Sequence, residues 1–575
     1  MRAGWGGRVV LGLAVAASFL AVVRVKAASQ ANSSIATQIA HQPESATVSK
    51  SEAKAENAKG DRLPPGTAFR TSDHCVACHN GLKTSQGEDI SIGLEWRASI
   101  MANSSRDPYW QGSVRRESID HPESKQAIQD ECSVCHMPAV RMADRDAGRH
   151  TDAFSRFHMQ MFPKGDKAAE DGVTCSVCHQ IEKTGLGTDA TFVGNVKIAP
   201  ADKNGNRPEY GPFDIDKGHQ TVMHSSTATY LPTQGDQMRD SGLCGSCHTL
   251  KTSALGPNGE KLATFPEQMP FQEWQHSEYN NNTQTCQYCH MPEVKEAVAI
   301  TALYGQPREG MHRHVFVGSN FVIEGILQDH RDELATAALP EEMDSAMKRT
   351  AEFLRTQAAK VTINSVNRTA NGVAVEVHVE NFGGHKLPTA YPSRRAWLHV
   401  VVTDGSGRVV FESGELNPDG SIVGNDNDAD PLKFEPHYRE ITNPEQVEIY
   451  EPILKDSQGN VTTGLLKAVG YLKDNRLLPH GFDKATAMKD IAVTGGAADD
   501  PDFNDHGSTV RYVVSTGSAT GPFKVEAELW FQPIGFRWAH NLAPYQASEP
   551  QRMVRYYEAA ARKSAMVLAK AEATQ

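Results

Sequence analysis

The sequence predicts a mixed fold: a mostly α-helical and irregular N-terminal domain, a connecting helix, and a C-terminal antiparallel β-sandwich-like domain that ends in an α-helix. Two observations predict this division. All ten cysteines lie between residues 75 and 290, whereas alternation of apolar and polar residues begins only after residue 360. The expected ranges are 1–28 for an N-terminal signal or anchor, 29–65 for a disordered linker, 66–338 for the first domain, 339–360 for the connecting helix, 361–548 for the β domain and 549–575 for the terminal helix.

The first 28 residues have the order of a secretory signal. Arg2 precedes an apolar run at 9–23, and small residues follow at 27 and 28. Arg24 and Lys26 come late for a cleaved signal, which leaves an uncleaved anchor open. The run is shorter than the ~20 residues that a spanning helix needs, so cleavage is favoured. We therefore expect export to the periplasm or beyond the cell.

Residues 29–65 are rich in Ala, Ser, Gln, Glu and Lys and hold almost no large apolar side chains. Such a segment cannot bury enough apolar surface to offset the entropy that it loses on folding. It is expected to be a tether between the N-terminal segment and the first domain.

Each cysteine belongs to a Cys-x-x-Cys pair that histidine follows directly. Histidine makes up 23 of 575 residues, so its presence after all five pairs by chance has a probability on the order of 10⁻⁷. Two thiols at this spacing can add to the two vinyl groups of one haem, while the adjacent imidazole reaches the iron. We therefore expect five covalently attached haem c groups, with their proximal ligands in the same motifs. The motifs are Cys75, Cys78 and His79; Cys132, Cys135 and His136; Cys175, Cys178 and His179; Cys244, Cys247 and His248; and Cys286, Cys289 and His290.

Two other uses of these cysteines fit the pattern poorly. Zinc ribbons combine Cys-x-x-Cys motifs in pairs and do not require histidine after each one, and five is an odd number of half-sites. A disulfide framework would rarely place every cysteine of an exported chain in an i, i+3 pair.

The five motifs share a short stretch of chain. The span from Cys75 to His290 leaves roughly 43 residues for each motif, fewer than a self-sufficient core usually needs. The haems are therefore expected to supply much of the core and to stack close together, with helical pieces and long polar loops around them.

The second axial position of each iron decides whether a haem only passes electrons or also binds a substrate. His224 precedes the fourth motif and His314 follows the fifth, and both are favoured as distal ligands. One of His150 and His158 is expected to serve, and His121 is a weaker alternative. Met101 could ligate through its thioether and would raise the potential of its haem. The candidates outnumber the five positions to be filled.

The second half of the chain changes its periodicity. Proline at a first-turn position predicts a helix over 340–360, and Asn371-Gly372 predicts a hairpin turn before the alternating residues 373–379. Residues 523–531 alternate in the same way, and 550–570 are predicted to be helical. His385 lies in a loop with Gly383, Gly384 and Pro388, from which it could reach a haem of the first domain.

From Cys75 to about Trp397 the chain resembles the multihaem cytochrome c family, in the group that includes the tetrahaem carrier of ammonia oxidation and pentahaem nitrite reductase. Beyond the five motifs, the resemblance rests on Cys135 to Pro138, Phe265 to Gln268 with Trp274, His314 with Phe316, Gly318 and Asn320, and Gly384, His385 and Pro388 with Arg394, Arg395 and Trp397. It implies stacked haems, mostly bis-histidine ligation and electron transfer, with added weight on His224, His314 and His385. The active haem of the nitrite reductase resembles a Cys-x-x-Cys-Lys site, which is absent from this sequence.

The leading hypothesis is an electron carrier with redox partner proteins as donor and acceptor. The alternative is an oxidoreductase that acts on a small nitrogen or sulfur compound at a five-coordinate haem. A formal charge of −12 and a pI near 6.0 argue against nucleic acid as a partner and suit a basic redox protein. An uncleaved N-terminus would add membrane association, and the sequence does not determine the oligomeric state.

Overall fold

The computed structural model describes residues 68–157, 166–227, 229–281 and 283–575. All of them belong to one compact unit, Asn57–Gln575. The predicted N-terminal signal or anchor and the linker lie outside the described residues. Within the described part of the chain, no helix has the length and apolar character needed to cross a membrane.

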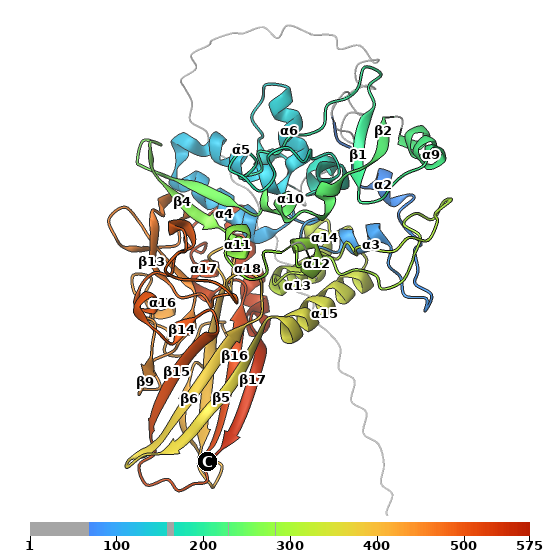
Figure 1. The fold of residues 1–575 in the computed structure, drawn as a ribbon. Helices are drawn as coiled ribbons and strands as arrows, with labels where there is room; N and C mark the ends of the chain where they lie inside the picture. The colour runs from blue at the N-terminus through green and yellow to red at the C-terminus, as the bar shows by residue number, and fades with distance from the viewer. Residues whose placement is uncertain (1–67, 158–165, 228, 282) are drawn as a thin grey trace, which may run out of the picture. The chain divides into compact units, whose positions relative to one another are not determined.

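Residues 68–338, which we call the cavity region, consist of short helices and long loops (Figure 1). Four strands form two small sheets: β1 (Arg207–Gly211) pairs with β2 (Tyr230–Gln234) in parallel, and β3 (Leu250–Leu255) with β4 (Lys261–Gln268) antiparallel. Among the described residues of this region, helices and loops thus predominate, in agreement with the expectation of helical pieces and long polar loops. The helices are α2 (Asp73–Val76), α3 (Ile92–Arg97), α4 (Pro108–Asp120), α5 (Lys125–His136), α6 (Pro138–Asp146), α7 (Lys167–Glu170), α8 (Cys175–Cys178), α9 (Lys217–Thr227), α10 (Ser241–Gly245), α11 (Pro270–Gln275), α12 (Cys286–His290), α13 (Phe321–Asp329) and α14 (Arg331–Leu334).

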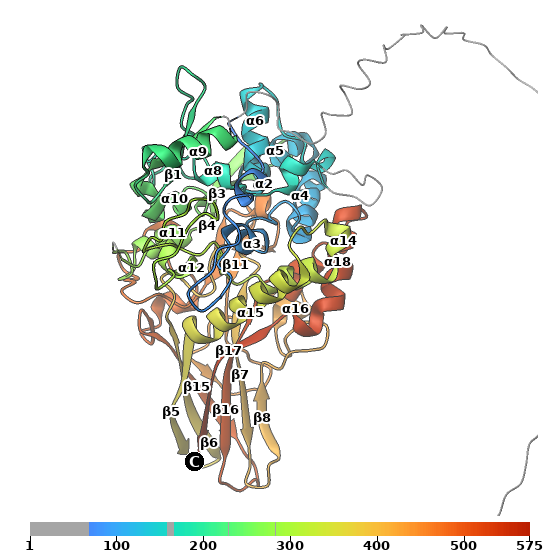
Figure 2. The same ribbon diagram turned by 90° about the vertical axis from the view of Figure 1, so that its right-hand side faces the viewer.

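Helix α15 (Pro340–Gln357) follows the cavity region where the sequence predicts a connecting helix. It begins at a proline, whose missing N–H costs nothing in a first turn. The Glu342 carboxylate accepts a hydrogen bond from the Leu339 N–H at 2.8 Å and pairs with Arg97 of α3. Figure 2 shows α15 between the cavity region and the sheets.

Residues 359–575, which we call the sheet region, contain two five-stranded sheets. The first has the order β14-β15-β6-β5 with β9 beside β15, and the second has β10-β7-β16-β17 with β8 beside β7. The expected hairpin joins β5 to β6, and Val377 lies opposite Val510 of β15. Inward-facing residues of both sheets pack in one hydrophobic cluster. The strands are β5 (Ala359–Arg368), β6 (Gly372–Asn381), β7 (Arg395–Thr403), β8 (Val409–Ser413), β9 (Glu440–Ile441), β10 (Ile449–Tyr450), β14 (Phe503–Asn504), β15 (Gly507–Ser515), β16 (Lys524–Gln532) and β17 (Met566–Thr574).

Smaller elements complete the sheet region. Strand β11 (Pro452–Lys455) pairs with β12 (Val461–Thr462) and β13 (Gly470–Asp474). The remaining helices are α16 (Asp426–Ala429), α17 (Phe536–His540) and α18 (Ser548–Ala560). Helix α18 packs against α4, and the Arg115 guanidinium of α4 lies 2.7 Å from the Glu549 carboxylate of α18.

The predicted terminal helix over 549–575 is wrong in its second half. Helix α18 ends at Ala560, and β17 then pairs antiparallel with β16. The residues of β17 are good helix formers, but Met566 and Leu568 alternate inward and are buried in the core. Pairing with the edge of β16 outweighs local propensity.

Candidate haem-binding cavity

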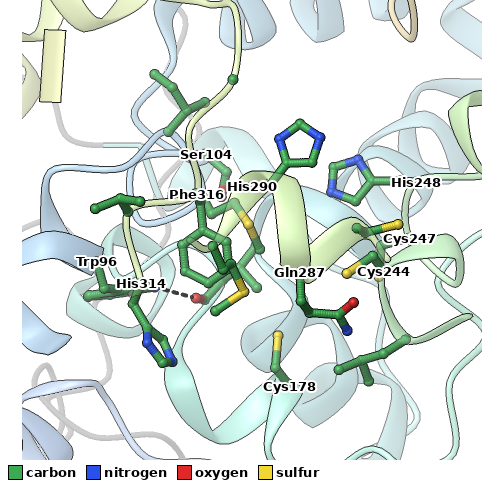
Figure 3. Close-up of a pocket in the computed structure, with 18 of the residues that line it drawn as sticks. Trp96, Ser104, Cys178, Cys244, Cys247, His248, Gln287, His290, His314 and Phe316 are labelled. Atoms are coloured by element: carbon green, nitrogen blue, oxygen red, sulfur yellow. Dashed lines mark hydrogen bonds between the residues drawn. The ribbon is translucent and has the colours of Figure 1, made fainter. Parts of the chain in front are cut away.

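One cavity of about 1830 Å³ brings the five motifs together. All ten cysteines and all five motif histidines line it, although they come from segments up to 215 positions apart in the chain, from Cys75 to His290. Figure 3 shows His248, His290 and His314 around part of this space, with Cys178, Cys244 and Cys247 nearby. The motifs are therefore neighbours in space.

The cysteines are positioned by short helices. Helices α2, α5, α8, α10 and α12 each contain one or both cysteines of a motif, which places the i and i+3 side chains on one face. All ten are free thiols, so the structure shows none of the disulfides that a framework would need.

Cysteines of different motifs approach one another. Three pairs lie within hydrogen-bonding reach of each other: Cys175 with Cys75, Cys135 with Cys247, and Cys244 with Cys286. Cys178 also lies close enough to Cys247 to affect the pKa of its own thiol. These pairs place the first motif in contact with the third, and the fourth motif in contact with the second and the fifth. The fourth motif also lies near the third.

The motif histidines are oriented through Nδ1. In four of them the Nδ1–H donates to a backbone carbonyl oxygen, which leaves Nε2 free to bind a metal. The acceptors are Ile300 for His79 at 2.6 Å, Ser104 for His136 at 2.8 Å, Tyr210 for His179 at 2.5 Å and Val317 for His290 at 2.6 Å. Burial lowers the pKa of His136 and of His290 to about 4, so these rings are neutral near pH 7, as ligation requires.

Two predicted distal ligands face motif histidines across the cavity. The His314 ring centre lies 6.4 Å from that of His179 with 13° between the planes, and His385 lies 6.2 Å from His290 with 18°. The Nδ1–H of His314 donates to the His312 carbonyl and that of His385 to the Lys386 carbonyl, so both Nε2 atoms are free. Burial lowers the pKa of His314 to about 3.

The spacing of these pairs fits a metal between the rings. Two imidazole-to-metal bonds of about 2 Å, each extended by about 1 Å to the ring centre, place the centres roughly 6 Å apart. By comparison, Trp110 stacks directly on His136 at 4.3 Å. The residues present therefore fit a haem: thiols for attachment, neutral imidazoles on both sides, and an apolar cavity.

The Gly383–Pro388 loop that carries His385 is fixed by buried charges. The Lys386 Nζ lies 2.7 Å from the Asp474 carboxylate, which also accepts from the Arg476 guanidinium at 2.8 Å. Glu273 of α11 accepts from the Lys386 N–H at 3.2 Å and pairs with Arg476 at 3.0 Å. This network joins the loop to both the cavity region and the sheet region.

The structure does not bring the other predicted ligands into such pairs. His224 does not line the cavity, and its Nε2 lies 2.7 Å from the Asn206 side-chain oxygen, so the nitrogen needed for ligation is occupied. His150 has a side chain 70% exposed, and His121 is buried next to Glu117 outside the cavity lining. Met101 lines the cavity. His158 lies outside the described residues.

Three further residues of the cavity wall make contacts or carry charges that bear on the site. The Nδ1–H of His312 donates to the Met291 carbonyl at 2.5 Å, which leaves its Nε2 free. Trp110 covers one face of His136, and Arg394 places a positive charge at the wall. His312 belongs to the set of histidines outside the motifs that outnumber the five distal positions, and it stands two residues before His314.

Comparisons with known proteins address the fold. None of the protein-family models matches the sequence, and no curated protein matches it. Among solved structures, the chain is similar to a penta-heme cytochrome c552 from Thermochromatium tepidum, with a TM-score of 0.50 and 16% sequence identity. The match covers 88% of this chain and 99% of that chain. The fold is thus similar to that of a penta-heme cytochrome.

Proposed function

We propose that the protein is an exported multihaem c-type cytochrome that holds five covalent haems and transfers electrons. The observation that carries this proposal is the single cavity lined by all fifteen motif residues, with thiols and free imidazole nitrogens at its wall. A haem supplies reversible one-electron chemistry, and the protein supplies attachment, axial ligands and close packing.

Contacts between motifs support electron transfer from haem to haem. Since cysteines of neighbouring motifs lie within contact distance, haems attached to them would have edges close together. The fourth motif, Cys244 to His248, contacts the second and fifth motifs and lies near the third, so it would be the branch point of the path.

Axial ligation follows from the facing rings. His179 with His314 and His290 with His385 would form two six-coordinate haems. The first test is the mass of the purified protein, which should exceed that of the mature polypeptide by five haems. A mass with four or fewer haems contradicts the proposal.

The ligand pair at the fifth motif has its own test. His385→Ala should keep five haems by mass and convert one of them from low spin to high spin in the electron paramagnetic resonance spectrum. His224→Ala is the matched control and should leave that spectrum unchanged, because its Nε2 is bonded to Asn206. A spectrum of His385→Ala identical to the wild type removes this residue from the ligands.

A second candidate function is reduction or oxidation of a small nitrogen or sulfur compound at an open iron. Among the described residues, no second histidine ring faces His79, His136 or His248 as His314 faces His179. The spin states of the oxidised protein decide between the two functions. Five low-spin haems leave only the carrier, whereas a high-spin haem in the wild type supports the enzyme.

A further inference from the structure

Arg394 is a cation at the cavity wall without a carboxylate partner among the described residues. It follows the His385 loop, and its Nη1–H donates to the Thr389 backbone carbonyl at 2.9 Å. Burial lowers the pKa of its guanidinium to about 10, which leaves it charged near neutral pH. A partly buried guanidinium has five N–H donors and is costly to leave without a counter-charge.

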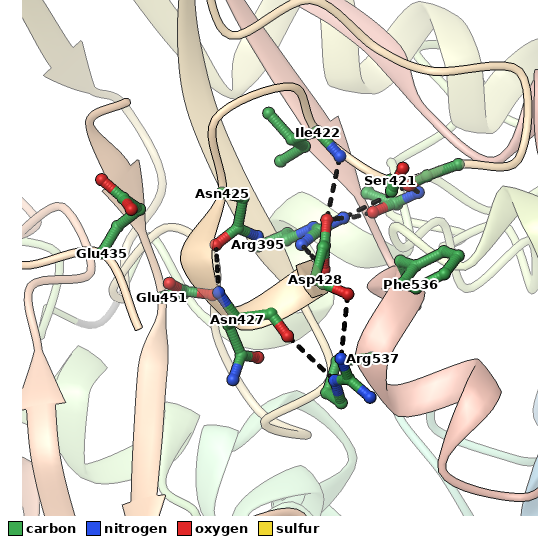
Figure 4. A network of polar contacts seen from close by, with 12 residues as sticks. Arg395, Ser421, Ile422, Asn425, Asn427, Asp428, Glu435, Glu451, Phe536 and Arg537 are labelled. Atoms are coloured by element: carbon green, nitrogen blue, oxygen red, sulfur yellow. Dashed lines mark hydrogen bonds and ion pairs between the residues drawn. The ribbon is translucent and has the colours of Figure 1, made fainter. Parts of the chain in front are cut away.

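Neighbouring buried arginines are paired. Arg395, the next residue, donates to both oxygens of the Asp428 carboxylate at 2.8 and 2.9 Å (Figure 4). Arg476 pairs with Asp474 and with Glu273. Since Arg395 points to the sheet region and Arg394 lines the cavity, the chain places two adjacent guanidinium groups in different surroundings and supplies a carboxylate to only one.

The position of Arg394 indicates where its partner would lie. Its charge lowers the pKa of His248, after the larger effect of burial, and it also acts on His385. Arg394 is therefore close to the proximal ligand of the fourth motif and to the loop that faces the fifth. An anion that met this guanidinium would lie inside the cavity beside those two motifs.

We propose that Arg394 is an anion-binding residue that pairs with a carboxylate or oxyanion inside the cavity beside His248 and His385. This inference rests on the proposed haem content. In either case the partner is a planar, singly charged group that accepts two hydrogen bonds from the guanidinium. Two sources can supply it: a propionate side chain of the haem at the fourth or fifth motif, or a free oxyanion that enters from solution.

The test uses the haem-loaded protein and compares Arg394→Gln with Arg408→Gln. Both substitutions remove one positive charge, but Arg408 is an exposed residue at the surface of the sheet region. Midpoint potentials are measured by spectroelectrochemical titration at constant ionic strength, with chloride as the only anion and then with added acetate, which is planar, singly charged and redox-inert. Mass spectrometry first establishes five haems in each sample, and their absence would defeat the haem proposal, not this one.

A haem propionate predicts that Arg394→Gln lowers the midpoint potential of one haem, because loss of the cation favours the oxidised form. Added oxyanions then leave the wild-type potentials unchanged. A free oxyanion predicts instead a saturable shift in the wild type that Arg394→Gln abolishes. Potentials and anion response identical to the wild type in Arg394→Gln overturn the proposal.

Arg394→Lys keeps the charge but loses the fork of donors, and it serves as a second variant if Arg394→Gln fails to accumulate. Resonance Raman spectra should show a displaced propionate bending band of one haem, or the anion affinity should fall several-fold. An unchanged spectrum together with unchanged anion affinity in Arg394→Lys contradicts anion pairing by Arg394.

Discussion

The cavity region and the sheet region have hydrophobic cores of different kinds. In the sheet region, 29 buried residues pack into one hydrophobic cluster between two sheets, and Met269, Leu354 and Ala358 complete that cluster from outside the region. Much of the cavity region is divided into three separate clusters of nine, seven and five residues, and they surround a cavity of about 1830 Å³. A further cluster contains residues of α13, α15 and α18 and connects the two regions. The difference teaches that in the first region the proposed haems would fill the volume that side chains fill in the second.

The largest effect is expected from removing one attachment site. In the double variant Cys244→Ser and Cys247→Ser, one haem should be lost, and the cavity region should unfold at a lower temperature because its fourth motif contacts the second and the fifth and lies near the third. Mass spectrometry and thermal unfolding followed by circular dichroism measure both. Ser246→Ala lies between the same cysteines and should retain five haems while losing one hydrogen bond, ~1 kcal/mol. If the double cysteine variant were as stable as Ser246→Ala, the haem would not be part of the core of the cavity region.

The next effect concerns the charges that join the regions. Asp474→Asn leaves Lys386 without its ion pair in a fully buried site and should cost ~3–5 kcal/mol of unfolding free energy. It should also alter the spectrum of the haem that we propose His385 to ligate, because Lys386 is the next residue. Denaturant unfolding and electron paramagnetic resonance check the two effects. A loss of stability with an unchanged spectrum would show that these buried charges stabilise the fold but do not position His385.

Asp474 also predicts a pH dependence. Burial acts to raise the pKa of its carboxyl, but the charges of Arg476 and Lys386 outweigh burial and hold it below the usual range. A lowered carboxyl pKa contributes stability above the unfolded pKa of ~4, and this stability is lost as pH falls through the folded value. The unfolding free energy of the wild type should therefore fall below about pH 4, and more steeply than in Asp474→Asn.

In the sheet region, Leu529→Ala should cost ~2–5 kcal/mol, because it leaves a cavity in a fully buried core. It should leave haem content and potentials unchanged, in contrast to the cysteine variants. Glu526→Gln, on the same strand and exposed, should change the unfolding free energy by less than ~0.5 kcal/mol. Loss of haem in Leu529→Ala would show that the two cores are not separate.

The smallest effect is expected where α4 meets α18. Arg115→Gln removes a two-bond contact with Glu549 and should cost ~1 kcal/mol. A double-mutant cycle with Glu549→Gln measures the coupling free energy between them. A coupling near zero would mean that apolar packing alone holds these helices together.

Local sequence patterns were sufficient to predict the elements that depend on the backbone conformation of their own residues. Pro340 and the hairpin residues Asn371 and Gly372 act through backbone conformation, which the sequence reveals directly. Strand β17 could not be predicted in this way, since its helix-forming residues pair with a strand more than 30 positions earlier. Pairing with an edge is a property of the whole fold.

The same limit applies to the axial ligands. His314 and His224 are indistinguishable as isolated histidines near motifs, but one offers a free Nε2 to the cavity and the other bonds Asn206. The carbonyl acceptors that orient the motif histidines come from positions as remote as Ile300 for His79. Such partners are backbone atoms and leave no mark in the residue types.

The position of His385 in the chain implies an order of assembly. It lies 95 residues after the last motif histidine, His290, and its loop is fixed only when Asp474 and Arg476 are in place. During synthesis from the N-terminus, all five motifs therefore become available before the residue that faces the fifth one. If the proposed haems are attached at that stage, attachment would be completed on an open chain, and the sheet region would then close the cavity around them.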